Sequence, residues 1–388
     1  MSYNFDLWTP RLGSQSMKWQ HLTADDPIHP ETLINLSIAE MDLPTSNEII
    51  QAIKERASQG IFGYTTSTDA KVIDSFISWM YRRFGHVVTP PQVLYVRGAN
   101  PALDASVKAF TEPGEGVIIM PPVFQNFARV VTTNDRTLVE NHLLQKECGR
   151  FAIDFDDLEA KAKDPNNKLL IFCSPNNPTS TLWEKDDLIR LGVICLNNGV
   201  KIVTDDVHQD IIRAGKTFYA IAPLFPDSKD IITITSLSKG FNLAGLQVCL
   251  MVVPCEEDKK ALEEVLGRQG TTPFSMTAIM AAYTASDAWL SEVNSYIDEN
   301  VRLFSDFMAK ELPKYPVAPV DSTYLAWLNL GALGMEDDAM MLFLREKAKL
   351  QLNSGLSYGT AGKGYVRVNL ATPKFVLEEA LKRLKKVL

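Results

Sequence analysis

Thr235-Ser236-Leu237-Ser238-Lys239-Gly240-Phe241-Asn242-Leu243-Ala244-Gly245-Leu246 is the most informative stretch of this 388-residue chain. It continues from an apolar, β-branched run, Ile231–Thr235, which predicts a buried strand. A lysine just beyond a strand end and among hydroxyls is poorly placed as a surface charge. It is well placed as a buried amine that bonds covalently to a carbonyl compound, with serines beside it to bind an anion.

Pyridoxal 5'-phosphate (PLP) needs this combination, because one amine must react with its aldehyde and several donors must hold its phosphate. Two other interpretations of the same residues remain open at this point. The spacing Ser-x-x-Lys, here Ser236 to Lys239, also occurs in serine-dependent acylases, and a lysine on a loop is solvated by default. The rest of the chain has to decide between them.

Composition predicts an ordinary soluble globular protein, and the length of 388 residues predicts either two domains or one large domain with a smaller lobe. Hydrophobic residues make up 46% of the chain and charged residues 22%. The formal net charge is −8 and no basic run occurs, which argues against a nucleic-acid partner. No apolar run is long enough to span a bilayer, and the N-terminus has no apolar signal segment, so we expect no membrane partner.

The cysteines and histidines suggest a reduced, metal-free protein. The five cysteines are odd in number, lie mostly in apolar contexts and form no C-x-x-C, which predicts free thiols in a cytoplasmic protein. The five histidines show no metal-ligand spacing, so no metal is expected.

Between about residues 90 and 255, short apolar runs alternate with helix-period segments. Continuous β-branched runs are typical of strands buried on both faces, and this alternation predicts an α/β core with a largely parallel sheet. The predicted strands are Val93–Val96, Val117–Met120, Lys168–Cys173, Lys201–Thr204, Ile231–Thr235 and Val248–Val253. In such sheets, ligands bind at the carboxyl ends of the strands.

The chain outside this core predicts further units. Residues 286–388, with a long helical stretch from Asp287 to Leu312, are expected to form a smaller α+β domain. Residues 46–285 would form the large cofactor-binding domain. Residues 1–45 are irregular and proline-containing, and we expect them to pack on the smaller domain.

Two strand-end turns are candidates for holding the cofactor. Gly98-Ala99-Asn100-Pro101 follows a strand and opens a helix, and free amides at a helix start bind phosphate. Phe124 follows two prolines after the next strand, where a fixed aromatic ring can stack on a flat heterocycle. A plain strand-to-helix turn and a core phenylalanine are the simpler alternatives.

Four further residues supply polar chemistry at strand ends. Asn177, in an Asn-Pro turn, could donate to a phenolic oxygen. Asp205 could pair with a protonated pyridine nitrogen, and His208, three residues on, could reach the ring oxygen. Arg367 lies in an alternating strand and could hold a substrate carboxylate through two hydrogen bonds. Alone, the Asn-Pro is a common turn, Asp205 is a helix cap, the Asp-x-x-His spacing of His208 is a weak signal, and Arg367 is a strand-exposed arginine. The ordered set of these residues is hard to explain by chance.

With these residues in place, essentially the whole chain resembles the class I/II aminotransferase family of fold-type I PLP enzymes. Within it, the chain is most similar to the carbon–sulfur β-lyase branch that includes cystathionine β-lyases of the MalY/PatB type. The segments that carry the branch resemblance are Met17-Lys18-Trp19, Ile38-Ala39-Glu40-Met41-Asp42, Gly60-Ile61-Phe62-Gly63-Tyr64-Thr65, Ser238–Leu246 and Thr323-Tyr324-Leu325-Ala326-Trp327-Leu328.

The resemblance implies a fold and a role for each candidate. The fold would be α/β, with a mostly parallel seven-stranded sheet flanked by helices and a smaller α+β domain. Lys239 would be the Schiff-base lysine and Asp205 the pyridinium partner. The remaining cofactor contacts would come from Ala99, Asn100, Ser236 and Ser238 at the phosphate, Asn177 and His208 near the ring oxygen, and Phe124 in the stacking position.

The resemblance also implies a homodimer with shared active sites. Tyr64 would reach the site of the neighbouring subunit and contact both cofactor and substrate. Arg367 would bind the substrate carboxylate, with Asn177 and Phe124 as further substrate contacts.

Several positions depart from the family pattern. Phe124 stands where tyrosine is usual, Ser180 where glycine is usual, and Glu40 where this branch usually has aspartate. Lys374 stands where arginine often follows Thr-Pro. Gln247 replaces a phosphate-binding arginine that many aminotransferases carry, which favours the lyase branch.

The sequence therefore predicts a PLP-dependent carbon–sulfur β-lyase that cleaves cystathionine or cysteine-S-conjugates to a thiol, pyruvate and ammonia. An aminotransferase using the same residues is the first alternative, because both reactions share one carbanion at Cα. A non-catalytic regulatory protein with the same fold is the second alternative, and the intact set of Lys239, Asp205 and Arg367 counts against it.

Overall fold

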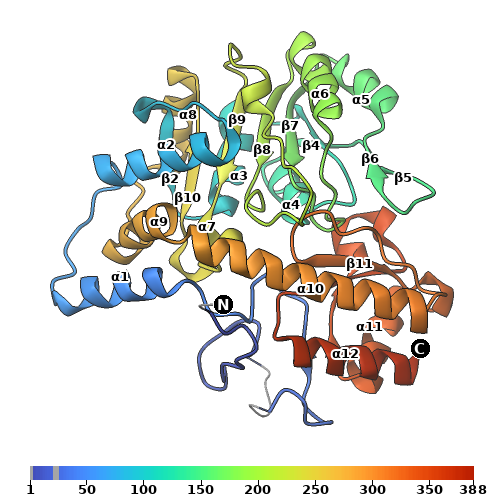
Figure 1. Cartoon of the computed structure of the whole chain (residues 1–388). Helices are drawn as coiled ribbons and strands as arrows, with labels where there is room; N and C mark the ends of the chain where they lie inside the picture. Colours follow the sequence, from blue (N-terminus) through green and yellow to red (C-terminus); the bar gives the residue numbers. More distant parts are fainter. Residues whose placement is uncertain (1–2, 21–25) are drawn as a thin grey trace.

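A seven-stranded sheet forms the centre of the larger part of the molecule (Figure 1). The computed structural model describes residues 3–20 and 26–388. Strand order is β2-β10-β9-β8-β7-β3-β4, and every neighbouring pair is parallel except the two pairs that involve β10. The strands are β2 (Val93–Val96), β3 (Gly116–Ile119), β4 (Thr137–Glu140), β7 (Asn167–Cys173), β8 (Lys201–Asp205), β9 (Ile231–Thr235) and β10 (Cys249–Val252). The predicted mostly parallel α/β sheet is confirmed.

All six strands predicted from apolar runs are present, with small differences at their ends. The seventh strand, β4 (Thr137–Glu140), was not among the predicted runs. None of its residues is fully buried, since it forms the edge of the sheet beside β3 alone. An edge strand that is half solvated lacks the continuous apolar run that marks a central strand.

Helices cover both faces of this sheet because alternate strand residues point to opposite sides. On one face, Val96, Ile119 and Ile234 pack with α3 (Ala99–Phe110), α4 (Asn126–Thr132) and α8 (Glu256–Leu266). On the other face, α5 (Phe155–Ala162) and α6 (Lys185–Asn197) cover one part. The helices α1 (Asn47–Ser58), α2 (Ala70–Phe84) and α9 (Pro273–Ala285) cover the rest. A short hairpin, β5 (Leu144–Gln145) and β6 (Phe151–Ala152), lies outside the sheet.

The smaller part of the chain is built on a three-stranded antiparallel sheet. Its order is β11 (Leu325–Asn329), β14 (Tyr365–Asn369) and β13 (Asn353–Ser354). Three helices pack with it: α10 (Asp287–Glu311), α11 (Asp337–Lys347) and α12 (Lys374–Val387). Helix α10 runs along both parts, since Trp289 lies in the large core and Phe304 in the small one (Figure 1).

The N-terminal segment contacts both parts of the molecule. Strand β1 (Ile34–Asn35) pairs in parallel with β12 (Leu350–Gln351) of the smaller part. Phe5, Met41 and Leu43 instead pack in the core of the larger part. The exact domain boundaries, after residues 45 and 285, stay predictions. Within residues 3–20 and 26–388, no helix is both long and apolar enough to cross a membrane.

Candidate active site

Lys239 lies in a four-residue helix, α7 (Leu237–Gly240), that begins directly after β9. Ser236 starts this helix, and its Oγ accepts a hydrogen bond from the backbone N of Ser238 at 3.1 Å. The lysine side chain therefore leaves the carboxyl end of the sheet, and its Nζ donates to the carbonyl oxygen of Ala39 at 2.6 Å. Burial, and then the nearby charge of Arg367, lower the pKa of Lys239 to about 8. A larger share of the amine is then neutral and nucleophilic near neutral pH.

A cavity of about 860 Å³ opens where the strands of the large sheet end. Ten of the eleven site residues predicted from the sequence line it. They are Ala99, Asn100, Phe124, Asn177, Asp205, His208, Ser236, Ser238, Lys239 and Arg367. These residues come from six separate segments of the chain, so the fold brings together side chains that lie far apart in the sequence.

Asp205 ends β8 and is a nearly buried carboxyl group, 5% exposed. Its Oδ1 accepts a hydrogen bond from the backbone N of Val207 at 3.3 Å. Burial raises the pKa of Asp205 to about 6. Among the described residues no lysine, arginine or histidine forms an ion pair with it. A cation bound in the cavity would therefore offset the free-energy cost of burying the ionised carboxylate.

His208 is buried close to Asp205, and it lies in a turn and not in a helix. The turn is held by backbone bonds from Gln209 N to Asp206 O and from Ile211 N to His208 O. Burial, with Lys239 and Arg367 nearby, lowers the pKa of His208 well below its usual value, so the imidazole is neutral. Its Nδ1 has no hydrogen-bond partner among the described residues.

Arg367 is held on several sides in the wall of the cavity. One terminal nitrogen donates to Asn177 Oδ1 at 3.0 Å, and the other donates to the carbonyl oxygen of Ser37 at 2.6 Å. The guanidinium carbon lies 5.2 Å from the ring centre of Tyr358, whose hydroxyl accepts from Asn353 at 3.0 Å. The Nε of Arg367 is buried and lacks a partner within the described part of the chain. A guanidinium fixed in this way is suited to bind a carboxylate.

Another part of the cavity lining offers donors for an anion. Gly98 has a φ of 101°, which a residue with a side chain rarely adopts, and this turn starts α3 at Ala99. The first backbone amides of that 12-residue helix face no acceptor from the preceding turn of helix, and its dipole favours negative charge. The hydroxyls of Ser236 and Ser238 line the same cavity.

These features fit PLP well. The cavity holds a lysine amine with a lowered pKa, a buried carboxyl group that needs a cation, and a neutral histidine with an unused ring nitrogen. A phosphate-sized anion site made of helix amides and hydroxyls completes the set. Simple acyl transfer by Ser236 would use little of this arrangement.

Tyr64 is the one predicted site residue that the single chain does not bring to the cavity. It lies in the loop between α1 and α2 and is fully exposed. Ile61 and Phe62 in the same loop are 75% and 57% exposed. Its role at the active site stays a prediction.

The sequence analysis missed several residues that line the cavity or contact its charged side chains. Tyr358 and Asn353 support Arg367, and the backbone oxygens of Ser37 and Ala39 contact the two site cations. A backbone carbonyl carries no signal in the residue type, so only the path of the chain could have identified Ser37 and Ala39. For Tyr358 the available signal was its position shortly before the arginine strand.

Comparison with known proteins shows the family of this chain and several full-length relatives. Residues 31–384 match the model of the family described as aminotransferase class I and II. Cystathionine beta-lyase PatB of Bacillus subtilis is 38% identical over 389 residues, which cover 99% of this chain and 100% of that protein. The crystal structure of cystalysin from Treponema denticola, which contains pyridoxal 5'-phosphate, has a TM-score of 0.94 at 30% identity. This match covers 100% of the present chain and 99% of the cystalysin chain. The PLP-bound C–S lyase of Staphylococcus hominis has a TM-score of 0.92 at 29% identity, covering 99% and 98%.

Proposed function

This chain belongs to the aminotransferase class I and II family, and on that basis we propose that it is a PLP-dependent carbon–sulfur β-lyase. Its substrates are cystathionine or cysteine-S-conjugates, and its products are a thiol, pyruvate and ammonia. The observation that carries the proposal is the lysine amine, buried carboxyl group and fixed guanidinium that meet in one cavity, in a chain similar to named lyases over its full length.

The residues that would hold the cofactor follow from the cavity. The amides of Ala99 and Asn100 and the hydroxyls of Ser236 and Ser238 would hold the phosphate. Asp205 would pair with the ring nitrogen, Asn177 and His208 would lie near the ring oxygen, and Phe124 would stack on the ring. When bound, PLP supplies an aldehyde for the substrate amine and a ring that accepts the negative charge left at Cα.

The protein residues then divide the remaining work. Arg367 binds the substrate carboxylate and so fixes the direction of the Cα–H bond. Lys239, with a pKa lowered to about 8, removes that proton as general base. Asp205 stays ionised beside a cation and thereby keeps the ring nitrogen protonated. The electron pair left at Cα expels the thiolate from Cβ.

The same proton transfer would also begin a transamination, which keeps the aminotransferase alternative in view. Transamination requires Lys239 to return the proton to the cofactor before the β-substituent leaves. A thiolate is a good leaving group, so expulsion should win with thioether substrates. Gln247, in place of a phosphate-binding arginine, and the named relatives favour the lyase.

The proposal is tested by the products of the purified protein with L-cystathionine. We expect thiol, pyruvate and ammonia in equal amounts. Alanine, which has no leaving group, should give at most one pyruvate per bound PLP in the absence of a 2-oxo acid, because the cofactor can then accept the amino group only once. A protein that binds PLP, releases no thiol from cystathionine, cystine or any cysteine-S-conjugate and forms no new amino acid with a 2-oxo acid would support the non-catalytic alternative instead.

We also propose a homodimer in which Tyr64 enters the partner's active site, and a cytoplasmic location. The support for the dimer is the exposed apolar loop that carries Ile61, Phe62 and Tyr64. The support for the location is that all five cysteines are free thiols.

Mixed dimers test the shared site. Chains with Tyr64→Phe and chains with Lys239→Ala should each be impaired alone. A heterodimer of the two contains one site in which both residues are intact, so activity should return to about half of that of the wild type per dimer. Verified heterodimers that recover no activity, from two impaired parents, would contradict a shared site.

A further inference from the structure

Residues 36–43, which we name the strap, contact both cations of the active site through backbone oxygens. The carbonyl oxygen of Ser37 accepts from Arg367 at 2.6 Å, and that of Ala39 accepts from Lys239 Nζ at 2.6 Å. Tyr324 also donates its hydroxyl to Ala39 O, at 3.1 Å. The position of the strap therefore helps to set where the amine and the guanidinium lie.

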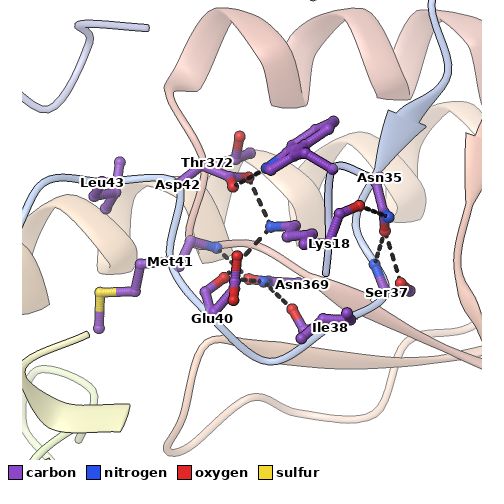
Figure 2. Close-up of polar contacts among 12 residues, drawn as sticks. Lys18, Asn35, Ser37, Ile38, Glu40, Met41, Asp42, Leu43, Asn369 and Thr372 are labelled. Carbon is purple, nitrogen blue, oxygen red and sulfur yellow. Dashed lines mark hydrogen bonds and ion pairs between the residues drawn. The ribbon is translucent and has the colours of Figure 1, made fainter. Parts of the chain in front are cut away.

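The strap has no regular secondary structure, so side chains from both parts of the molecule hold it. From β14, Asn369 donates to the carbonyl oxygens of Ile38 and Glu40, both at 2.7 Å (Figure 2). From the loop after Lys239, Asn242 accepts from Met41 N at 3.0 Å and donates to the carbonyl oxygens of Met41 and Leu43.

A third anchor comes from the N-terminal segment and is a buried ion pair. Lys18 Nζ lies 2.8 Å from Asp42 Oδ2, and the two side chains are 0% and 2% exposed (Figure 2). Lys18 Nζ also donates to Glu40 O at 3.4 Å, and Trp19 Nε1 donates to Asp42 Oδ1 at 3.1 Å. Arg11 adds a weaker contact to Asp42, at 3.8 Å.

Fully buried ion pairs are not an efficient source of stability, because desolvation of the two charges offsets most of their attraction. Their direction and distance are nevertheless specific, and removing one partner leaves a buried charge unpaired. This pair has almost no solvent exposure and holds the strap at Asp42, three residues after the Ala39 carbonyl that contacts Lys239, so it is suited to fixing the position of the strap.

We propose that Lys18 and Asp42 form a positioning pair, which holds the strap so that Ala39 O and Ser37 O orient Lys239 and Arg367 for catalysis. Neither residue lines the active-site cavity, so both act through the strap. The catalytic meaning of the pair rests on the proposed function, because it assumes the roles given there to Lys239 and Arg367.

The charges around Lys239 give the direction of the expected effect. The groups that face its amine are Arg367 on β14, which lowers its pKa, and Glu40 in the strap and Asp205 on β8, which raise it. His208 also lies nearby and is neutral. Burial is the main cause of the low pKa, and Asn369 and Asn242 still hold the strap over the site in variants of Lys18 or Asp42, so the amine stays buried. Ala39 O and Glu40 both favour the ammonium form, so a small shift that lengthens these two contacts should lower the pKa of Lys239 below about 8.

The test measures the amine directly, without turnover. The full-length chain, freed of PLP, is labelled with trinitrobenzenesulfonate at a series of pH values, and the Lys239 peptide is quantified by mass spectrometry. For Lys18→Met, Asp42→Asn and the double variant, we expect the pH midpoint to fall by about one unit. The double variant leaves no unpaired charge, so it tests the proposal even if the single variants fold poorly.

Arg383→Met is the matched control. Arg383 is also a buried cation, and it ties the N-terminal segment to α12 by donating to the carbonyl oxygens of His29 and Thr32 at 2.9 and 2.7 Å. It does not contact the strap through any hydrogen bond found in the described residues. Its loss should lower thermal stability while the Lys239 midpoint stays that of the wild type.

Steady-state kinetics of the PLP-loaded protein form the second arm. The double variant should lose about tenfold to a hundredfold in kcat/KM for cystathionine, and the double and single variants should lose similar amounts because the pair acts as a unit. A double variant with the wild-type labelling midpoint and unchanged kcat/KM would overturn the positioning role. Absence of lyase turnover in the wild type would instead overturn the proposed function, and the labelling result would still stand.

Discussion

Replacing Lys239 with alanine is expected to lower kcat for cystathionine cleavage by at least about 10³-fold. A positioned general base contributes roughly 10²- to 10⁴-fold, and Lys239 is also the amine that would bond to the cofactor. No other lysine lines the cavity among the described residues, so no second amine can replace it. The measurement is pyruvate formation under saturating PLP and substrate.

Two controls separate loss of the amine from loss of the fold. Lys201 is a partly buried lysine that pairs with Asp230 and Asp258. It begins β8, at the end of the strand away from the cavity, so Lys201→Met should retain most of kcat. Borohydride reduction of the wild type with PLP should place the cofactor on the Lys239 peptide. A Lys239→Ala protein that keeps wild-type kcat, or an adduct on another lysine, would refute the role of Lys239.

Replacing Asp205 with asparagine is expected to leave PLP binding largely intact and to lower kcat by about 10²-fold or more. Asparagine has nearly the same shape but no charge, so it cannot keep the ring nitrogen protonated. Loss of one preorganised electrostatic contact of this kind costs roughly 10²- to 10³-fold in other enzymes. Absorbance of the bound cofactor measures binding, and pyruvate release measures kcat.

Asp206 provides a matched control for this change. It is the next residue, 1% exposed, and burial raises its pKa well above the usual value. It accepts a hydrogen bond from Thr204 and does not line the cavity. Asp206→Asn makes the same chemical change in a buried carboxyl group that lies outside the cavity, so it should change kcat by only a few-fold. If Asp205→Asn behaved like Asp206→Asn, the assignment of Asp205 would be wrong.

The pH dependence of the free energy of unfolding should also report the burial of Asp205. The pKa of Asp205 in the folded chain without cofactor is raised to about 6, above its value in an unfolded chain. The unfolded state thus loses this proton first, and the ionised carboxylate costs stability as pH rises from about 4 through 6. Asp205→Asn should remove that loss, so chemical denaturation of the PLP-free variant should show a flatter stability profile across this range. An unchanged profile would contradict a buried, unpaired Asp205.

The main elements of the fold and site could be predicted from sequence because their signals are local. Buried strands appear as β-branched runs, and Lys239, Asp205 and Asn177 are chemically unusual residues placed just where such runs end. Residue type and position at a strand end together were enough to predict that these side chains lie at one edge of the sheet. The family resemblance added the expected number of seven strands, without the location of the seventh, and the role of Arg367 as the residue that binds the substrate carboxylate.

The features that could not be predicted depend on where the chain travels. Strand β4 (Thr137–Glu140) is short and half solvated, so it lacks a periodic apolar signal. Ser37 and Ala39 act through backbone oxygens, which every residue possesses. The burial of Lys18 against Asp42 was equally hidden, since an isolated lysine in a polar N-terminal segment is normally solvated.

The partition between β-elimination and transamination tests the central claim most directly. The purified protein is incubated with cystathionine, PLP and a 2-oxo acid acceptor, and pyruvate plus ammonia is measured against new amino acid and the pyridoxamine form of the cofactor. Because a β-thiolate leaves readily once Lys239 has taken the Cα proton, we predict that pyruvate and ammonia dominate. A dominant yield of new amino acid and pyridoxamine phosphate would contradict the lyase and identify the protein as an aminotransferase.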